Sequence, residues 1–80
     1  MDIRVNVFAN LRDYYDSVFT LEIPDGANVE SVLNKLEQKH PESEQILKSC
    51  RIAVGEDLVD KNYLLQENEE VFLLPPSSGG

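Results

Sequence analysis

Hydrophobic and polar residues alternate along two segments near the start of the chain, residues 2–8 and residues 17–23. A period of two is typical of β-strands that bury one face. The residues predicted to face the core are Ile3, Val5 and Val7 in the first strand and Phe19, Leu21 and Ile23 in the second. Between the two strands, residues 9–16 lose the alternation and indicate a turn with a little helix.

The pattern changes to a helical period after the turn residues Pro24-Asp25-Gly26. Asn28 is suited to cap the helix, and Pro41 ends it because the residue before a proline avoids helical backbone. The residues predicted to form its buried face are Val29, Val32, Leu33 and Leu36. A second short helix is expected to begin at Pro41, and the residues it is expected to bury are Ile46 and Leu47.

Three more strands are predicted in the C-terminal half. They are residues 51–54, the very short pair Leu58-Val59, and residues 70–74. Residues 60–68 are expected to be irregular, with Leu64 and Leu65 turned inward. Pro75-Pro76 stops the last strand because proline cannot donate to a sheet ladder.

This order of elements predicts an α+β fold of the β-grasp (ubiquitin-like) type. We expect a mixed sheet of about five strands, with one main helix on one face and the last strand beside the first. Residues 1–76 would form this single domain, and residues 77–80 a flexible tail ending in Gly-Gly. The other face of the sheet would then remain open to solvent or to a partner.

Composition excludes several classes of function. The net charge of -8, with 15 acidic and seven basic residues, argues against a nucleic-acid partner because phosphates would be repelled. No apolar run approaches the roughly 20 residues of a membrane helix, and no signal peptide is evident, so we expect a cytoplasmic protein without a membrane partner. A single cysteine excludes an internal disulfide framework.

The outer face of the predicted sheet carries apolar residues near the tail. If alternate residues point inward, then Phe8, Phe72 and Leu74 point outward and lie together on the adjacent first and last strands. An exposed apolar patch on a small acidic protein indicates a protein-binding surface. The alternative is that an edge loop carrying Tyr14 or Tyr15 folds over the patch.

The tail follows directly from this patch. Pro75 and Pro76 would hold it extended, which lowers the entropy lost when a partner captures it. A terminal glycine has no side chain, so the carboxyl of Gly80 can enter a narrow active site. The carboxyl of Gly80 is therefore the predicted functional group, with Gly79 giving clearance.

The chain resembles the small, sulfur-carrier subunit of molybdopterin synthase, a ubiquitin-like family. The resemblance covers the whole chain and rests mainly on two stretches, Val7-Phe8-Ala9-Asn10-Leu11-Arg12-Asp13 and Leu74-Pro75-Pro76-Ser77-Ser78-Gly79-Gly80. Two positions depart from the family pattern. Gly55 stands where the family usually has Asn, and Asn68-Glu69 stands where it usually has Gly-Asp.

The resemblance implies a chemistry for the tail. A ubiquitin-activating-like adenylyltransferase would transfer AMP from ATP to Gly80, and a persulfide sulfur donor would displace the AMP to leave a thiocarboxylate. The tail would then enter the large catalytic subunit, in an expected heterotetramer, and give sulfur to cyclic pyranopterin monophosphate in molybdenum cofactor biosynthesis. Residues Pro75, Pro76, Ser77 and Ser78 would span the channel, and Phe8, Phe72 and Leu74 would dock the partners.

Other residues whose side chains could take part in a reaction or bind a metal fit structural roles better. Cys50 is expected to be a half-buried hydrophobe, and His40 to interact with the last carbonyls of its helix. No second His or Cys stands at ligand spacing, so no metal site and no stably bound cofactor are expected. The run Glu67-Asn68-Glu69-Glu70 indicates a solvated acidic turn. The chain alone is thus not predicted to be an enzyme.

Three alternatives use the same fold differently. A ubiquitin-like modifier would join its C-terminus to substrate lysines through an isopeptide bond. A sulfur carrier of another pathway, such as thiamine thiazole synthesis or tRNA thiolation, would form the same thiocarboxylate. A plain structural adaptor would tolerate removal of Gly80.

Overall fold

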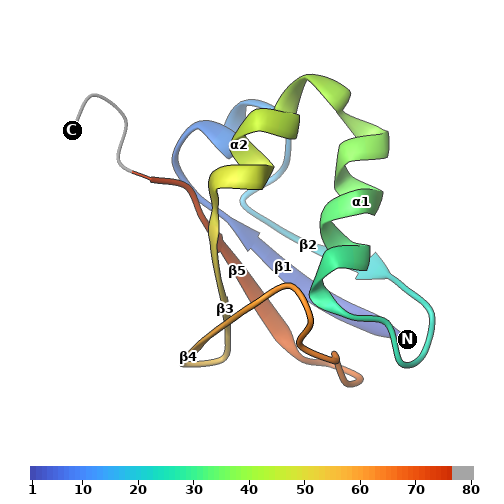
Figure 1. The fold of residues 1–80 in the computed structure, drawn as a ribbon. Coiled ribbons are helices and arrows are strands. Elements are labelled where there is room, and N and C mark those ends of the chain that lie inside the picture. Colours follow the sequence, from blue (N-terminus) through green and yellow to red (C-terminus); the bar gives the residue numbers. More distant parts are fainter. Residues whose placement is uncertain (77–80) are drawn as a thin grey trace.

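The computed structural model describes residues 1–76, in which a five-stranded sheet carries its helices on one face (Figure 1). The elements are β1 (Asp2–Val7), the 3-10 helix η1 (Ala9–Asp13), β2 (Val18–Glu22), α1 (Val29–Lys39), the 3-10 helix η2 (Pro41–Ser43), α2 (Glu44–Ser49), β3 (Arg51–Val54), β4 (Asp57–Val59) and β5 (Glu70–Leu74). Every predicted strand and the main helix are present within a residue or two of their expected ends. The second helix expected from Pro41 is instead the 3-10 helix η2 followed by α2, in which Leu47 is buried and Ile46 is half-buried.

The strands lie in the order β2-β1-β5-β3-β4. The central strands β1 and β5 are parallel, and every other neighbouring pair is antiparallel. Both central strands therefore run toward the same end of the sheet, where the chain leaves β5 (Figure 1). This mixed sheet confirms the predicted β-grasp arrangement, with the last strand beside the first.

Helix α1 forms where the sequence supplies both an apolar stripe and a cap. The Asn28 side chain accepts a hydrogen bond from the Ser31 backbone N–H at 3.1 Å, which satisfies one of the free amides of the first turn. The buried residues of α1 are Val29, Val32, Leu33 and Leu36, each at most 6% exposed. They pack on the inward residues of the sheet, including Ile3, Val5, Leu21, Val71 and Leu73. The helical and strand periods thus predicted the core.

Tyr15 ties the first loop to the helical layer. Its ring stacks on Phe19 at 5.9 Å, and its hydroxyl bonds the Leu36 carbonyl oxygen at 2.7 Å and Ser43 Oγ at 2.9 Å. Tyr14 lies against His40 on the same side, with ring centroids 6.1 Å apart. These tyrosines therefore do not cover the outer face of the sheet, and the alternative in which they shield the apolar patch is wrong.

The prediction that Leu64 turns inward is also wrong. Leu64 is 65% exposed, whereas Leu65 beside it is only 3% exposed. Leu64 forms an isolated bridge with Asn28, and the Leu65 N–H donates to the Ala27 carbonyl at 2.9 Å. Because successive side chains of an extended segment point to opposite sides, only one of the two leucines can reach the core.

Two turns explain the departures from the family pattern. Gly55 and Asn68 both have positive φ angles, 60° and 67°. Glycine and asparagine are the two residues that adopt this left-handed backbone at least cost. Exchanging one for the other at these turns therefore keeps the turn geometry.

Candidate functional site: the outer sheet face and the root of the tail

The parallel pairing of β1 with β5 brings the predicted patch residues together. Asn6 lies opposite Phe72 and Val7 opposite Leu73, so Phe8 follows β1 at the level where β5 reaches its end. The rings of Phe8 and Phe72 are stacked with centroids 6.5 Å apart and an angle of 22° between their planes. Phe8, Phe72 and Leu74 are half-buried, while Val7 and Leu73 between them are fully buried. The three predicted patch residues thus line the outer face together, each only partly exposed to solvent.

The loop after β1 places a cation at the edge of this patch. Ala9 has a φ of 53°, and this left-handed residue turns the chain sharply from β1 into η1. Arg12 in η1 then reaches back, donating from Nε to the Val7 carbonyl at 3.3 Å. Its guanidinium carbon lies 5.5 Å from the centroid of the Phe8 ring, a cation–π distance. Arg12 therefore orients Phe8 and borders the patch.

The apolar surface extends further than the sequence indicated. Strand register aligns one outward residue from each strand in a single row across the sheet, namely Val18, Asn6, Phe72, Ala53 and Leu58. Leu58 is 64% exposed and Val18 is 49% exposed at the two edges. Sequence reasoning missed both residues because their alignment with Phe72 depends on strand pairing between distant segments. We call this row, together with Phe8 and Leu74, the docking face.

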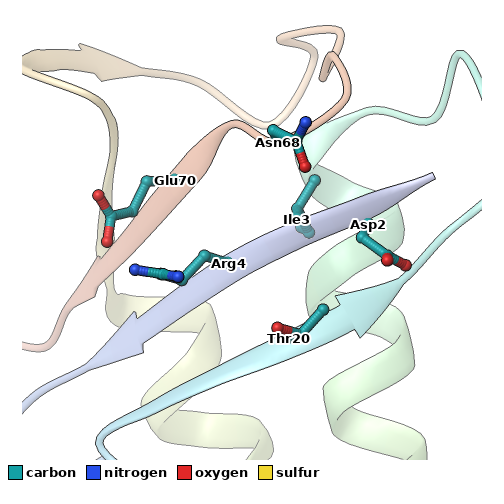
Figure 2. Close-up of a pocket in the computed structure, with 6 residues that line it drawn as sticks. All are labelled: Asp2, Ile3, Arg4, Thr20, Asn68 and Glu70. Atoms are coloured by element: carbon teal, nitrogen blue, oxygen red, sulfur yellow. The ribbon is translucent and has the colours of Figure 1, made fainter.

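The other half of the outer face is polar. A hollow of about 400 Å³ lies here, and its lining includes Asp2, Arg4, Thr20 and Glu70, whose side chains are labelled in Figure 2. Arg4 and Glu70 lie opposite each other on β1 and β5, and the Glu70 carboxylate accepts a 3.0 Å hydrogen bond from the Asn6 amide. The hollow holds charges of both signs but no thiol or imidazole. Its lining is therefore that of a polar surface.

The tail begins beside the docking face. Leu74, the last residue of β5, lies opposite Arg51, the first residue of β3. Pro75 is half-buried and Pro76 is exposed. The remaining predicted site residues, Ser77, Ser78, Gly79 and Gly80, lie outside the described residues, and their roles stay predictions.

Cys50 and His40 occupy structural positions. Burial raises the pKa of the Cys50 thiol to about 11, and its Sγ donates to the Ile46 carbonyl at 3.2 Å. A neutral thiol at physiological pH is a poor nucleophile. His40 lies edge-on to Tyr15 at 5.0 Å, with Nδ1 3.9 Å from a Glu42 carboxylate oxygen. Within residues 1–76, no three His, Cys, Asp or Glu side chains gather as metal ligands would.

The helices of residues 1–76 include none with the length and apolar character needed to cross a membrane. The model of the ThiS family matches residues 5–80, which is nearly the whole chain.

The chain belongs to the ThiS family.

One curated relative, the molybdopterin synthase sulfur carrier subunit of Chlamydomonas reinhardtii, is 34% identical over the full length of both chains. The small archaeal modifier protein 1 of Methanosarcina acetivorans has a similar structure, with a TM-score of 0.81 at 26% identity over 99% of this chain and 96% of that one. One chain of the complex of subunits 1 and 2 of the molybdopterin-converting factor of Helicobacter pylori also has a similar structure, with a TM-score of 0.71 at 23% identity and both chains fully covered. These likenesses confirm the ubiquitin-like β-grasp fold of this ThiS-family chain.

Proposed function

We propose that this chain is the sulfur carrier subunit of a molybdopterin synthase and that Gly80 carries the sulfur. The observation that carries the proposal is the position of the tail root, where β5 ends in Pro75-Pro76 beside the docking face. A partner seated on this face would receive the tail directly. The sequence kinship with a named sulfur carrier subunit over the full chain length supports the same role.

The proposed chemistry begins at the Gly80 carboxylate, which is a poor electrophile. An activating adenylyltransferase joins it to AMP from ATP and releases pyrophosphate. A persulfide sulfur then attacks the acyl carbon and expels AMP, and a thiol cleaves the resulting S–S bond to leave the thiocarboxylate. This group is anionic at neutral pH and nucleophilic, as thiolates are. In the large subunit it gives its sulfur to cyclic pyranopterin monophosphate, all of this in the cytoplasm.

The role of the β-grasp domain in this scheme is recognition. The docking face supplies apolar area around Phe8, Phe72 and Leu58, and the aromatic residues are of the type that dominates interface energetics. Burial holds Cys50 as a neutral thiol, so it is a poor nucleophile. Catalytic groups and the substrate pocket are assigned to the partners, so the chain is proposed as a non-catalytic subunit.

Pyrophosphate exchange tests the first step. The activating adenylyltransferase of the same organism is mixed with the chain, ATP and labelled pyrophosphate, and label entering ATP is counted. We expect exchange with the full chain and none when Gly80 is deleted, because the reacting carboxyl is then displaced by one residue. Exchange that persists without Gly80 would contradict the proposal.

A second candidate function is protein modification. It is favoured by the structural likeness to the small archaeal modifier protein 1 of Methanosarcina acetivorans. Both functions begin with adenylation of Gly80, but they diverge at the acceptor. Isopeptide-linked lysine conjugates in the host would support the modifier function, whereas loss of molybdoenzyme activity on deletion would support the synthase function.

A further inference from the structure

The basic residues of the chain are segregated by type. The arginines lie on or beside the outer face of the sheet, whereas three of the four lysines lie on the helices and the fourth, Lys61, lines a hollow that Arg51 also borders. The arginines are Arg4 in β1, Arg51 in β3 and Arg12 over the Phe8 ring. The lysines are Lys35 and Lys39 in α1, Lys48 in α2, and Lys61 in the segment after β4. Because arginine is the basic residue enriched at protein interfaces, this distribution marks the outer face as a contact surface.

Charge also divides the outer face into two halves. The acidic residues that the strands place outward are Asp2, Glu22 and Glu70, and all of them lie in the half away from the tail. The residues of the docking face include no acid, although the Glu70 carboxylate accepts a hydrogen bond from the Asn6 amide at its border, and Arg12 and Arg51 border the face on the side of the tail. A protein with a net charge of -8 therefore presents an apolar and cationic surface beside the root of its tail.

Arg51 and Arg12 differ in the contacts that their side chains make within the chain. The Arg12 guanidinium bonds the Val7 carbonyl and lies over Phe8. Arg51 is exposed, and its side chain makes no hydrogen bond or ion pair with any of residues 1–76. The nearby carboxylate of Asp60 instead accepts the Asn62 backbone N–H at 2.8 Å. The charge of Arg51 thus has no partner in the described part of the chain.

The surroundings of Arg51 favour a protein ligand. It borders a hollow of about 330 Å³ that is also lined by the apolar residues Ile52, Leu58 and Val59 and by the charged residues Asp60 and Lys61. The Arg51 guanidinium is exposed next to apolar area, with the Lys61 cation in the same hollow, and this arrangement suits a carboxylate at the edge of an apolar contact. A polyanion such as a nucleic acid would be repelled by the net negative charge of the rest of the molecule.

We propose that Arg51 determines partner specificity by pairing with a carboxylate that the large synthase subunit presents beside the docking face. The inference rests on the proposed function and adds to it the chemistry of the partner surface. Because Arg51 lies opposite Leu74, the ion pair would sit at the tail root and fix the direction in which the tail enters the partner. The partner surface is therefore apolar at its centre and acidic at the edge that meets β3.

The test compares two charge reversals of the same size. Arg51→Glu places a negative charge on the docking face, and the control Lys39→Glu places one on the exposed end of α1. The dissociation constant for the large subunit of the same organism is measured by calorimetry at low and at high salt. At low salt we expect Arg51→Glu to weaken binding by about tenfold or more, while Lys39→Glu stays within about twofold of wild type. Thermal unfolding of each variant establishes that the fold is retained.

A rescue experiment identifies the partner carboxylate. Acidic residues of the large subunit are changed one at a time to arginine, and one such change is expected to restore binding to Arg51→Glu. If Arg51→Glu binds as tightly as Lys39→Glu, the inference is overturned and the docking face alone holds the partner.

The proposed function can fail separately. If the wild-type chain does not bind the large subunit at all, the synthase role is overturned together with the inference. Pyrophosphate exchange on wild-type Gly80 reports on carrier chemistry independently of Arg51. If Arg51→Glu loses pyrophosphate exchange but still binds the large subunit as wild type does, then Arg51 contacts the activating enzyme instead. That result would overturn the inference.

Discussion

Iodoacetamide should alkylate Cys50 of the native chain at pH 8 about 20-fold more slowly than it alkylates the urea-unfolded chain at the same pH. The reason is that burial raises the pKa of the thiol and that the Sγ hydrogen donates to the Ile46 carbonyl. The prediction concerns the central claim directly, because Cys50 is the one cysteine of the chain and would compete with a thiocarboxylate for any thiol reagent.

The magnitude follows from the fraction of thiolate. With a pKa of about 11, roughly one Cys50 in 1,000 is ionised at pH 8, against about one in four for an ordinary cysteine with a pKa near 8.5. This gives a ratio of roughly 240. A more basic thiolate is intrinsically more nucleophilic, by about 10- to 18-fold over this difference in pKa. The net slowing is therefore roughly 15- to 25-fold.

The assay is a time course of alkylation followed by mass spectrometry of the fragment containing Cys50. Native and unfolded alkylation rates within about twofold of each other would refute the reasoning, because the thiol would then be neither desolvated nor hydrogen-bonded to the Ile46 carbonyl. The matched variant Cys50→Ala should load Gly80 with sulfur as well as wild type does. Failure of this variant to load, with its fold intact, would instead make Cys50 a sulfur relay.

Three further predictions concern the fold that positions the tail. Leu36→Ala, at a fully buried site, should lower the free energy of unfolding in urea by about 2–5 kcal/mol, whereas Leu58→Ala at an exposed site should change it by less than about 0.5 kcal/mol. Asn28→Ala should cost about 1 kcal/mol in the same titration by removing the cap of α1, and no loss would show that the cap is dispensable. Burial raises the pKa of Tyr15 above its ordinary value of 10.0, so its contribution to stability is present below that pH and is lost as the pH rises through the higher folded-state pKa. Tyr15→Phe should abolish that alkaline loss, measured as unfolding free energy against pH, and an unchanged profile would assign the loss to other groups.

Local patterns were sufficient to predict most of the fold. Alternation identified β1 and β2, and helical spacing with Asn28 as cap and Pro41 as terminator identified α1. These features depend on neighbours within a few residues, so they are visible in the sequence alone. Leu64 was misplaced because the segment from residues 60–68 has no regular period. Its bridge to Asn28, which turns Leu64 outward, depends on a distant part of the chain.

The docking face was predicted only in part for the same reason. Phe8, Phe72 and Leu74 follow from alternation and from the adjacency of two strands. Leu58 and Val18 join them only through the register of β4 with β3 and of β2 with β1, which no local pattern specifies. The position of Arg12 over Phe8 depends on the left-handed backbone of Ala9, a conformation that the residue type does not reveal.

Two features of the sequence predict Gly80 as the functional residue. One is its free terminal carboxyl on a tail that Pro75 and Pro76 would hold extended, and the other is the resemblance to a sulfur carrier family. The chain belongs to the ThiS family, but Gly80 lies outside the described residues and its role stays a prediction. Its role therefore has to be established on the molecule in solution.

The most direct test is mass spectrometry of the chain purified from its host under non-reducing, mildly alkaline conditions. Replacing one carboxylate oxygen by sulfur adds about 16 Da, and the C-terminal fragment must carry this addition because oxidation elsewhere gives nearly the same mass. At pH 6.5 iodoacetamide should label the thiocarboxylate but leave the Cys50 thiol unmodified. The sulfur carrier account predicts a labelled Gly80. Gly80 found only as a free carboxylate, even with the activating enzyme, ATP and a persulfide donor supplied, would contradict it.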